Sequence, residues 1–243
     1  MKLSIDALSA SYDGQPILEN LSFAVGEGEF VSILGPSGCG KSTILNILAG
    51  VVKPDGGSVS VDGATISGPT AHFAYMPQED LLLPWKTILD NVCLYGAVHG
   101  QKQAAAKEAL ALFPVFGLAG YENAYPDALS GGMRQRAAFL RTAMCQADIL
   151  LLDEPFGALD VITRSDMQDW LQEMRSQLGK TTLLVTHDVD EAIYLSDRIL
   201  ILNGRPASIR KEITITEPAR SRDWLYAQGD LRTEIHHLLK EVH

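Results

Sequence analysis

One glycine-rich stretch carries the residue types that can hold a phosphate group. Its spacing is G-x-x-x-x-G-K-[ST], in which the glycines let backbone N–H groups turn inward around an anion. Lys41 can reach the β- and γ-phosphates of a nucleotide, and the Ser42 hydroxyl can ligate Mg²⁺. We therefore predict a nucleotide site in this stretch, named here the phosphate loop, which consists of Gly35, Pro36, Ser37, Gly38, Cys39, Gly40, Lys41, Ser42 and Thr43.

Two carboxylates lie at the end of an apolar run further along the chain. Asp153 and Glu154 directly follow residues 149–152, which are all Ile or Leu. Because ligands bind beyond the carboxyl ends of parallel strands, Asp153 is expected to hold Mg²⁺ directly or through water. Glu154 can then polarise an attacking water as a general base. The alternative is a pair of solvated acids. His187, at the end of the run 182–186, is expected beside the γ-phosphate.

Two further positions are open to more than one interpretation. Ser130 precedes Gly131 and Gly132 at the start of an expected helix, where it suits an N-cap. This helix start fits an ordinary cap and a second anion site equally well, since free N–H groups attract anions. Tyr12 lies in a turn, where its ring either stacks on a base or packs against neighbouring residues.

Apolar periodicity indicates the elements that must position these residues. The runs 30–34, 149–152 and 182–186 are largely apolar, as expected for a parallel sheet whose faces are covered by helices. Segments 3–8 and 21–25 alternate apolar and polar residues, which predicts a small antiparallel layer near the N-terminus. The chain is therefore expected to adopt an α/β fold.

The remaining periodicity is helical. A segment of helices is expected to interrupt the β-rich parts, and one of these helices is expected to include Trp85, Ile88, Leu89, Val92 and Tyr95. The tail has apolar residues at the spacing of a short amphipathic helix, at Leu231, Ile235, Leu238 and Val242. We expect a core with its β layer at 1–83 and 147–215, a helical subdomain at 84–146, and a C-terminal tail helix at 216–243.

Composition limits the classes of partner. The formal net charge of the 243 residues is −10, which argues against nucleic-acid binding through a broad basic surface. The three cysteines have no metal-type spacing, and an odd, sparse number suits a reducing compartment. The N-terminus lacks the apolar core of a signal peptide, and no stretch approaches the roughly 18 apolar residues of a membrane span. Any association with a membrane is therefore expected to come through partners.

In their order along the chain, these motifs resemble the ATP-binding subunit of ABC transporters. The phosphate loop is similar to the Walker A motif, residues 149–154 to Walker B, and Leu129-Ser-Gly-Gly132 to the signature motif. The resemblance extends over nearly the whole chain, with one departure, Met133, where many members have glutamine. It implies that Tyr12 is the A-loop aromatic that stacks on adenine, that Asp160 lies in the D-loop and that His187 is the switch histidine. It also implies that the Q-loop residue Gln78 is catalytic and binds the metal ion together with Ser42 and Asp153.

The resemblance also implies a fold and a set of partners. The fold is a P-loop NTPase core with a mainly parallel sheet, an N-terminal antiparallel β layer and an inserted helical subdomain. Two subunits would form a head-to-tail homodimer, with each ATP between the phosphate loop of one and residues 129–132 of the other. The dimer would work with Mg²⁺ and transmembrane permease subunits at the cytoplasmic face of the inner (cell) membrane, where it would be peripheral. An extracytoplasmic solute-binding protein would complete the system.

The resemblance narrows to one importer group and leaves two rival functions. Residues 78–85 and 129–136 are similar to the nitrate/sulfonate/taurine importer group, which includes importers of thiamine precursors. Residues 218–222 and 231–235 of the tail match this group more weakly, and their arginines fit a solvated face as well. One rival is a soluble ABC ATPase acting as a nucleotide-gated switch in translation or DNA repair, but such proteins commonly carry a second nucleotide domain or a long coiled coil. The other is a regulator without hydrolysis, which Glu154 and His187 disfavour.

Overall fold

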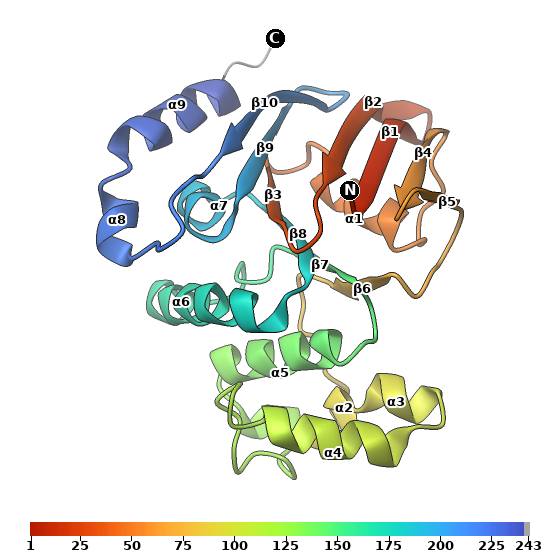
Figure 1. Cartoon of the computed structure of the whole chain (residues 1–243), viewed down its shortest axis with the longest axis vertical. Helices are drawn as coiled ribbons and strands as arrows, with labels where there is room; N and C mark the ends of the chain where they lie inside the picture. The colour runs from red at the N-terminus through yellow and green to blue at the C-terminus, as the bar shows by residue number, and fades with distance from the viewer. Residues whose placement is uncertain (241–243) are drawn as a thin grey trace.

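The computed structural model describes residues 1–240, apart from the side chain of residue 176. A six-stranded sheet forms the centre of the molecule, in the order β10-β9-β3-β8-β7-β6 (Figure 1). Its strands are β3 (Phe30–Leu34), β6 (Phe73–Met76), β7 (Ile149–Asp153), β8 (Thr181–Thr186), β9 (Arg198–Asn203) and β10 (Ser208–Thr214). All neighbours are parallel except β10, which pairs antiparallel with β9 at the edge. The expected parallel sheet is confirmed.

Burial explains why these strands are apolar throughout. Every residue of β3, β7 and β8 is buried, since both faces of the sheet are covered. One face packs on a second, four-stranded sheet and on α1 (Lys41–Leu48). The other face packs on the helices that follow the sheet strands and on the helical part of the chain.

The second sheet confirms the expected antiparallel layer. Its order is β2-β1-β4-β5, from β1 (Leu3–Tyr12), β2 (Gln15–Val25), β4 (Gly56–Val61) and β5 (Ala64–Ile66). Alternate residues of β1 point inward, and Leu3, Ile5 and Leu8 are buried. The sequence indicates a hairpin turn at Asn203-Gly204, and the antiparallel pairing of β9 with β10 confirms it, whereas β5 was not anticipated.

Four helices form a separate layer at the bottom of Figure 1: α2 (Ile88–Val92), α3 (Leu94–Val98), α4 (Lys102–Leu112) and α5 (Gly131–Ala143). The expected helix through Trp85 is wrong at its start. Thr87 accepts a hydrogen bond from Asp90 N and caps the first turn, so α2 begins at Ile88. Trp85 precedes the helix with its side chain exposed. A short 3₁₀ turn, η1 (Pro126–Ala128), leads into α5.

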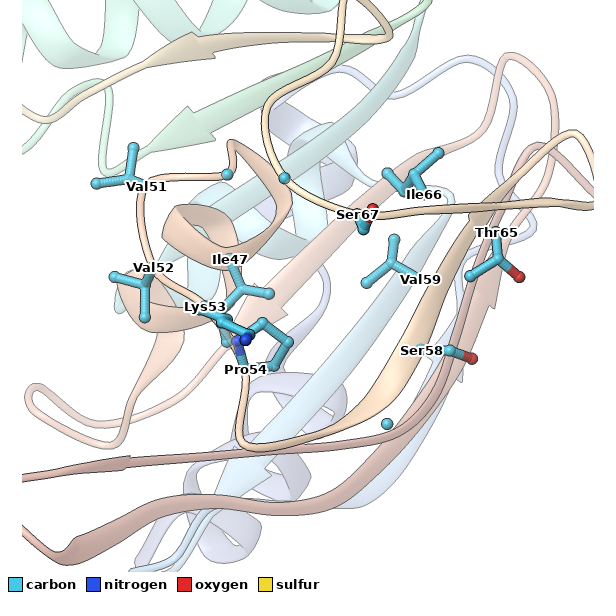
Figure 2. A pocket seen from close by; sticks show the side chains of 13 residues that line it. Ile47, Val51, Val52, Lys53, Pro54, Ser58, Val59, Thr65, Ile66 and Ser67 are labelled. Atoms are coloured by element: carbon cyan, nitrogen blue, oxygen red, sulfur yellow. The ribbon is translucent and has the colours of Figure 1, made fainter.

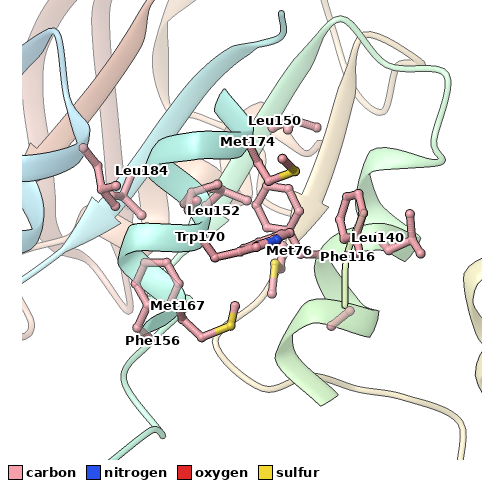
Figure 3. Close-up of a cluster of buried hydrophobic side chains, with 14 of the residues drawn as sticks. Met76, Phe116, Leu140, Leu150, Leu152, Phe156, Met167, Trp170, Met174 and Leu184 are labelled. Carbon is pink, nitrogen blue, oxygen red and sulfur yellow. The ribbon is translucent and has the colours of Figure 1, made fainter. Parts of the chain in front are cut away.

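Aromatic side chains join this helical layer to the central sheet. Phe116 follows α4, and its ring centroid lies 5.1 Å from that of Trp170 on α6 (Val161–Leu178). Phe139 of α5 meets the same indole edge-on, at 5.4 Å. Figure 3 shows Phe116 and Leu140 from the helical layer facing Trp170 and Leu152 of the core. The two parts of the chain therefore share one hydrophobic core.

The C-terminal tail packs on the core instead of presenting a solvated arginine face. Arg222, which begins α8 (Arg222–Tyr226), donates to Asp169 Oδ1 at 2.8 Å and to Ser165 O at 2.6 Å on α6. Arg232 of α9 (Gly229–Lys240) pairs with Asp190 of α7 (Val189–Leu195), and Ile235 is fully buried. The tail thus contains two helices instead of the single helix expected. Val242, the last of its expected apolar positions, lies outside the described residues. None of the helices within 1–240 has the length and apolar character needed to cross a bilayer.

Candidate nucleotide-binding and catalytic site

The phosphate loop connects the end of β3 to the start of α1. Gly40 has φ of 103°, in the left-handed region that favours glycine, and a Cβ there would lie 2.6 Å from Ile17 Cγ2. At Gly35 a Cβ would lie 2.9 Å from both Cys39 Sγ and Leu202 O. Only glycine fits either position, so the loop can wrap tightly where the spacing motif requires it.

Lys41 lies at the centre of this loop. Its Nζ donates to Gly35 O at 2.9 Å and to Pro36 O at 3.0 Å, and its side chain is 4% exposed. The same Nζ lies 4.0 Å from Glu154 Oε1. The ammonium is therefore held inside the loop and next to the carboxylate that the sequence analysis assigned as the base.

The residues assigned to Mg²⁺ include two oxygen donors that already touch. Ser42 Oγ donates to Asp153 Oδ1 at 3.0 Å. Burial raises the pKa of the Asp153 carboxyl, while its hydrogen bonds from Ser42 and Tyr75 oppose that rise. A hydroxyl and a carboxylate side by side are hard oxygen ligands, and Mg²⁺ commonly uses one or two protein ligands together with phosphate oxygens and water. The donor set fits this ion.

Tyr75 is a member of the site that the sequence analysis missed. Its hydroxyl donates to Asp153 Oδ2 at 3.0 Å, from the neighbouring strand β6. Burial and the adjacent carboxylate raise the pKa of Tyr75, so the phenol keeps its proton and remains a donor. The two bonds to Asp153 leave its side chain little freedom to rotate.

Glu154, His187 and Gln78 converge beyond the ends of β7 and β8. Glu154 Oε1 lies 3.1 Å from His187 Nδ1, and the Glu154 backbone has φ of 43°, a strained value for a residue with a side chain. A Cβ on Gly157 would lie 3.4 Å from Gln78 Nε2 and 3.7 Å from Glu154 Oε2, so Gln78 also borders this point. A carboxylate, an imidazole and an amide therefore face one small region of the sheet edge.

The residues of the signature motif gather at a different place. Ser130 caps α5, where its Oγ accepts from Met133 N at 3.4 Å, as the N-cap expectation required. Gly131 packs near Leu159, and both line a cavity of about 330 Å³ that also includes Gln78. Leu129 is buried beneath this helix start, whereas Gly132 packs against Thr163, since a Cβ on it would lie 2.8 Å from the Thr163 methyl group.

Asp160 and Tyr12 take contrasting positions. Asp160 Oδ1 accepts from Ile162 N and Thr163 N, both at 3.1 Å, and thereby caps α6. The Thr163 side chain, together with these backbone N–H groups, holds the pKa of the Asp160 carboxyl below its ordinary value. Tyr12 ends β1 with 71% of its surface exposed, so within this chain its ring is not packed. The exposed ring is available to a base.

A buried carboxyl group and a half-buried arginine behind the site were also missed. Glu191, on α7, is 3% exposed, and burial raises the pKa of its carboxyl well above the ordinary value. Arg164 of α6 donates to Leu159 O at 3.1 Å and lies 3.8 Å from Asp188 Oδ2. The sequence shows both only as polar residues in amphipathic helices, a pattern that does not reveal which face is buried.

A large hollow among the described residues lies away from this chemistry. Figure 2 shows it between the end of α1 and the β4–β5 hairpin, with Ile47, Val59 and Ile66 among the residues that line it. Its volume is about 490 Å³, and Lys53 is the one charged residue among the described residues that line it. The phosphate loop lies at the opposite end of α1. A large cavity is therefore not by itself a guide to the place that the polar geometry indicates.

Comparison with known proteins agrees with this geometry. The family described as ABC transporter matches residues 18–157, more than half of the chain. The formylaminopyrimidine import ATP-binding protein ThiZ of Halalkalibacterium halodurans is 44% identical over 222 residues, covering 90% of this chain and 87% of ThiZ. The taurine import ATP-binding protein TauB of Pseudomonas aeruginosa is 43% identical over 237 residues, covering 94% and 87%.

Solved structures show the same fold. A dimeric post-hydrolysis state of the ATP-binding cassette MJ0796, bound to ADP and Pi, superposes with a TM-score of 0.74 at 29% identity, covering 88% of this chain and 99% of that one. A second dimeric structure of MJ0796, a bacterial ABC transporter cassette, gives the same score at 30% identity. The expected P-loop NTPase fold and the assignment as an ATP-hydrolysing subunit are confirmed. This chain belongs to the ABC transporter family.

Proposed function

We propose that this chain binds and hydrolyses ATP to drive import of a small organic solute of the sulfonate, nitrate, taurine or thiamine-precursor type. The relatives named above are ATP-binding proteins of taurine and formylaminopyrimidine import. Solute choice belongs to the permease and the extracytoplasmic solute-binding protein. The chain then acts on the cytoplasmic face of the cell membrane, as a peripheral subunit bound to that permease.

The observation that carries the proposal is the meeting of Lys41, Glu154 and His187 at one end of the sheet. Lys41 and His187 lie 4.0 and 3.1 Å from the same carboxylate oxygen of Glu154. The side chain of Glu154 is 18% exposed, so solvent reaches it only in part. Such a carboxylate can accept a proton from water that attacks the γ-phosphate, while Lys41 stabilises charge on the phosphate oxygens.

Ser42, Asp153 and Gln78 would hold Mg²⁺. When bound, the ion neutralises charge on the phosphate chain and orients it. The chain itself prepares the place, because Tyr75 and Ser42 fix both oxygens of Asp153. Tyr12 would stack on the adenine from the exposed end of β1.

The signature residues serve the site of a second copy in this proposal. Ser130 and Gly131 begin a helix in the lower layer of Figure 1, whereas the phosphate loop begins α1 in the upper part. The two related structures are dimers. We infer a head-to-tail homodimer in which the N–H groups at Ser130 bind the γ-phosphate held by the partner's Lys41.

A surface on the helical layer is suited to the permease. The exposed side chains of Leu81 and Trp85 flank the buried Leu82. Arg141 donates to Leu81 O at 2.7 Å and also lines a cavity of about 290 Å³ with Tyr95 and other residues. Exposed apolar patches commonly mark partner sites. Because Gln78 precedes this surface by three residues, movement there can pass to Glu154.

Crosslinking tests the shared site directly. With the three native cysteines replaced by alanine and Glu154→Gln added, Ser37→Cys and Ser130→Cys should form disulfides between chains in Mg-ATP. A matched control pairs Ser37→Cys with Lys107→Cys, an exposed position on α4 that should not react. Bonds confined to single chains, or equal yield in both pairs, would contradict the dimer.

A further inference from the structure

The turn between β9 and β10 lies directly beside the phosphate loop. β9 is the parallel neighbour of β3, with Leu34 opposite Ile201. Parallel neighbours end at the same edge of a sheet, so the segments that follow them leave side by side. The phosphate loop follows β3, and residues 204–207 follow β9. A close approach confirms this, because a Cβ on Gly35 would lie 2.9 Å from Leu202 O.

Both ends of this turn are anchored. Asn203 Nδ2 donates to Leu238 O at 3.0 Å, which ties the turn to α9, and Asn203 Oδ1 accepts from Gly204 N at 2.7 Å. At the other end, Ala207 N donates to Ile17 O at 2.7 Å on β2. Arg205 therefore projects from a backbone that is held on two sides.

The side chain of Arg205 reaches the phosphate loop. Its Nη2 lies 2.8 Å from the point where a Cβ on Gly38 would stand, so the guanidinium rests on the loop backbone. The same positive charge acts on the thiol of Cys39, where it opposes the rise in pKa that burial causes. Within residues 1–240 no carboxylate lies within 4.0 Å of Arg205, whose side chain is exposed. Among these described residues, no ion pair therefore neutralises its charge.

We propose that Arg205 is a second cation for the phosphate chain of a nucleoside di- or triphosphate, acting beside Lys41. The inference rests on the proposed nucleotide site. A chain with a net charge of −10 repels a polyphosphate at long range, and a cation at the rim of the loop offsets that repulsion locally. Lys41 is buried within the loop, whereas Arg205 is exposed at its edge. A guanidinium can also bind two phosphate oxygens at once.

Calorimetric titration with Mg-ADP and with AMP tests this role on the full chain. Arg205→Gln should weaken Mg-ADP binding about fourfold at low salt, as expected for an exposed charge pair. The loss should shrink towards unity as NaCl rises from about 50 to about 500 mM, because screening removes the attraction. Binding of AMP should change less than binding of Mg-ADP, and Arg205→Lys should recover most of the affinity.

The matched control is Arg210→Gln, which removes the same charge from an exposed position on β10. Equal losses in the two variants would overturn the proposal in favour of a net-charge effect. A loss that is independent of salt would overturn it in favour of a structural role. Normal Mg-ADP affinity with impaired ATP-dependent dimerisation would reassign Arg205 to the partner subunit. Lys41→Ala is measured alongside, because normal binding in that variant would instead refute the nucleotide site itself.

Discussion

Replacing Phe116 by alanine tests whether the helical layer and the core unfold as one unit. Phe116 lies after α4 and is 1% exposed. Its ring meets Trp170 of α6 at a centroid distance of 5.1 Å and Phe139 of α5 at 6.3 Å. These contacts cross from the helical layer to the core, so removing the ring leaves a cavity at the joint between them.

The magnitude follows from this burial. Truncation of a fully buried phenylalanine costs about 3–5 kcal/mol, which combines lost transfer free energy with the cavity that remains. Loss of the tilted and edge-on ring contacts accounts for about 1 kcal/mol of this total. For a chain of this length, 1 kcal/mol lowers the melting temperature by about 2–4 °C. We expect Phe116→Ala to melt about 10 °C below the wild type, in a single transition.

Thermal unfolding followed by circular dichroism measures this shift, and urea unfolding measures the free energy. Val115→Ala is the matched control, because Val115 is adjacent and 43% exposed, and should cost about 0.5 kcal/mol or less. Two results would refute the reasoning. One is a shift of Phe116→Ala no larger than that of the control. The other is a split transition in which the core retains its wild-type melting temperature.

Four further variants test the site, the permease surface and the buried carboxyl. Lys41→Ala should abolish ATPase activity and weaken Mg-ADP binding at least tenfold, since the central cation is lost. Near-normal turnover in this variant would contradict the assignment of the phosphate loop to the nucleotide site. Glu154→Gln should bind Mg-ATP with affinity close to wild type and hydrolyse it at least a hundredfold more slowly, because an amide is not a base. Hydrolysis by this variant at the wild-type rate would exclude the role of Glu154 as the base. Trp85→Ala should leave basal ATPase activity intact and reduce transport in membrane vesicles, unless the isolated subunit loses stability, which would assign Trp85 to the fold. Glu191→Gln should be as stable as the wild type near pH 5 and more stable near pH 8 by urea unfolding. The folded carboxyl has a raised pKa, so the wild type loses stability as pH rises above about 4.5, and an equal pH dependence would contradict this.

The local motifs were the most predictable part of the molecule. The phosphate loop, the N-cap at Ser130 and the run that ends in Asp153 each depend on neighbours within a few residues, so their sequence determines their conformation. The helix through Trp85 was wrong for a related reason. Helical spacing of apolar residues continues past the true start, whereas the cap at Thr87 decides where the first turn forms.

Contacts between distant segments were much less predictable. The tail arginines Arg222 and Arg232 can be interpreted as solvated residues from sequence, because nothing nearby reveals that α6 and α7 present Asp169 and Asp190 to them. The hydrogen bond from Tyr75 to Asp153 likewise joins β6 to β7, which lie far apart in the sequence. These features require the order of the strands and the packing of the helices, which local periodicity does not contain.

Strand order would have found the two residues that most extend the site. Tyr75 belongs to β6, which lies parallel to β7 with Met76 opposite Leu152, so its hydroxyl lies near Asp153 at the same sheet edge. Arg205 follows β9, which lies parallel to β3 and therefore ends beside the phosphate loop. Neither belongs to a recognised motif. Once neighbouring strands are known, polar residues close to the carboxyl end of each parallel strand become candidates, because these ends surround the same ligand. Chemistry in this fold is thus located by which strands are adjacent as much as by the motifs that each strand carries.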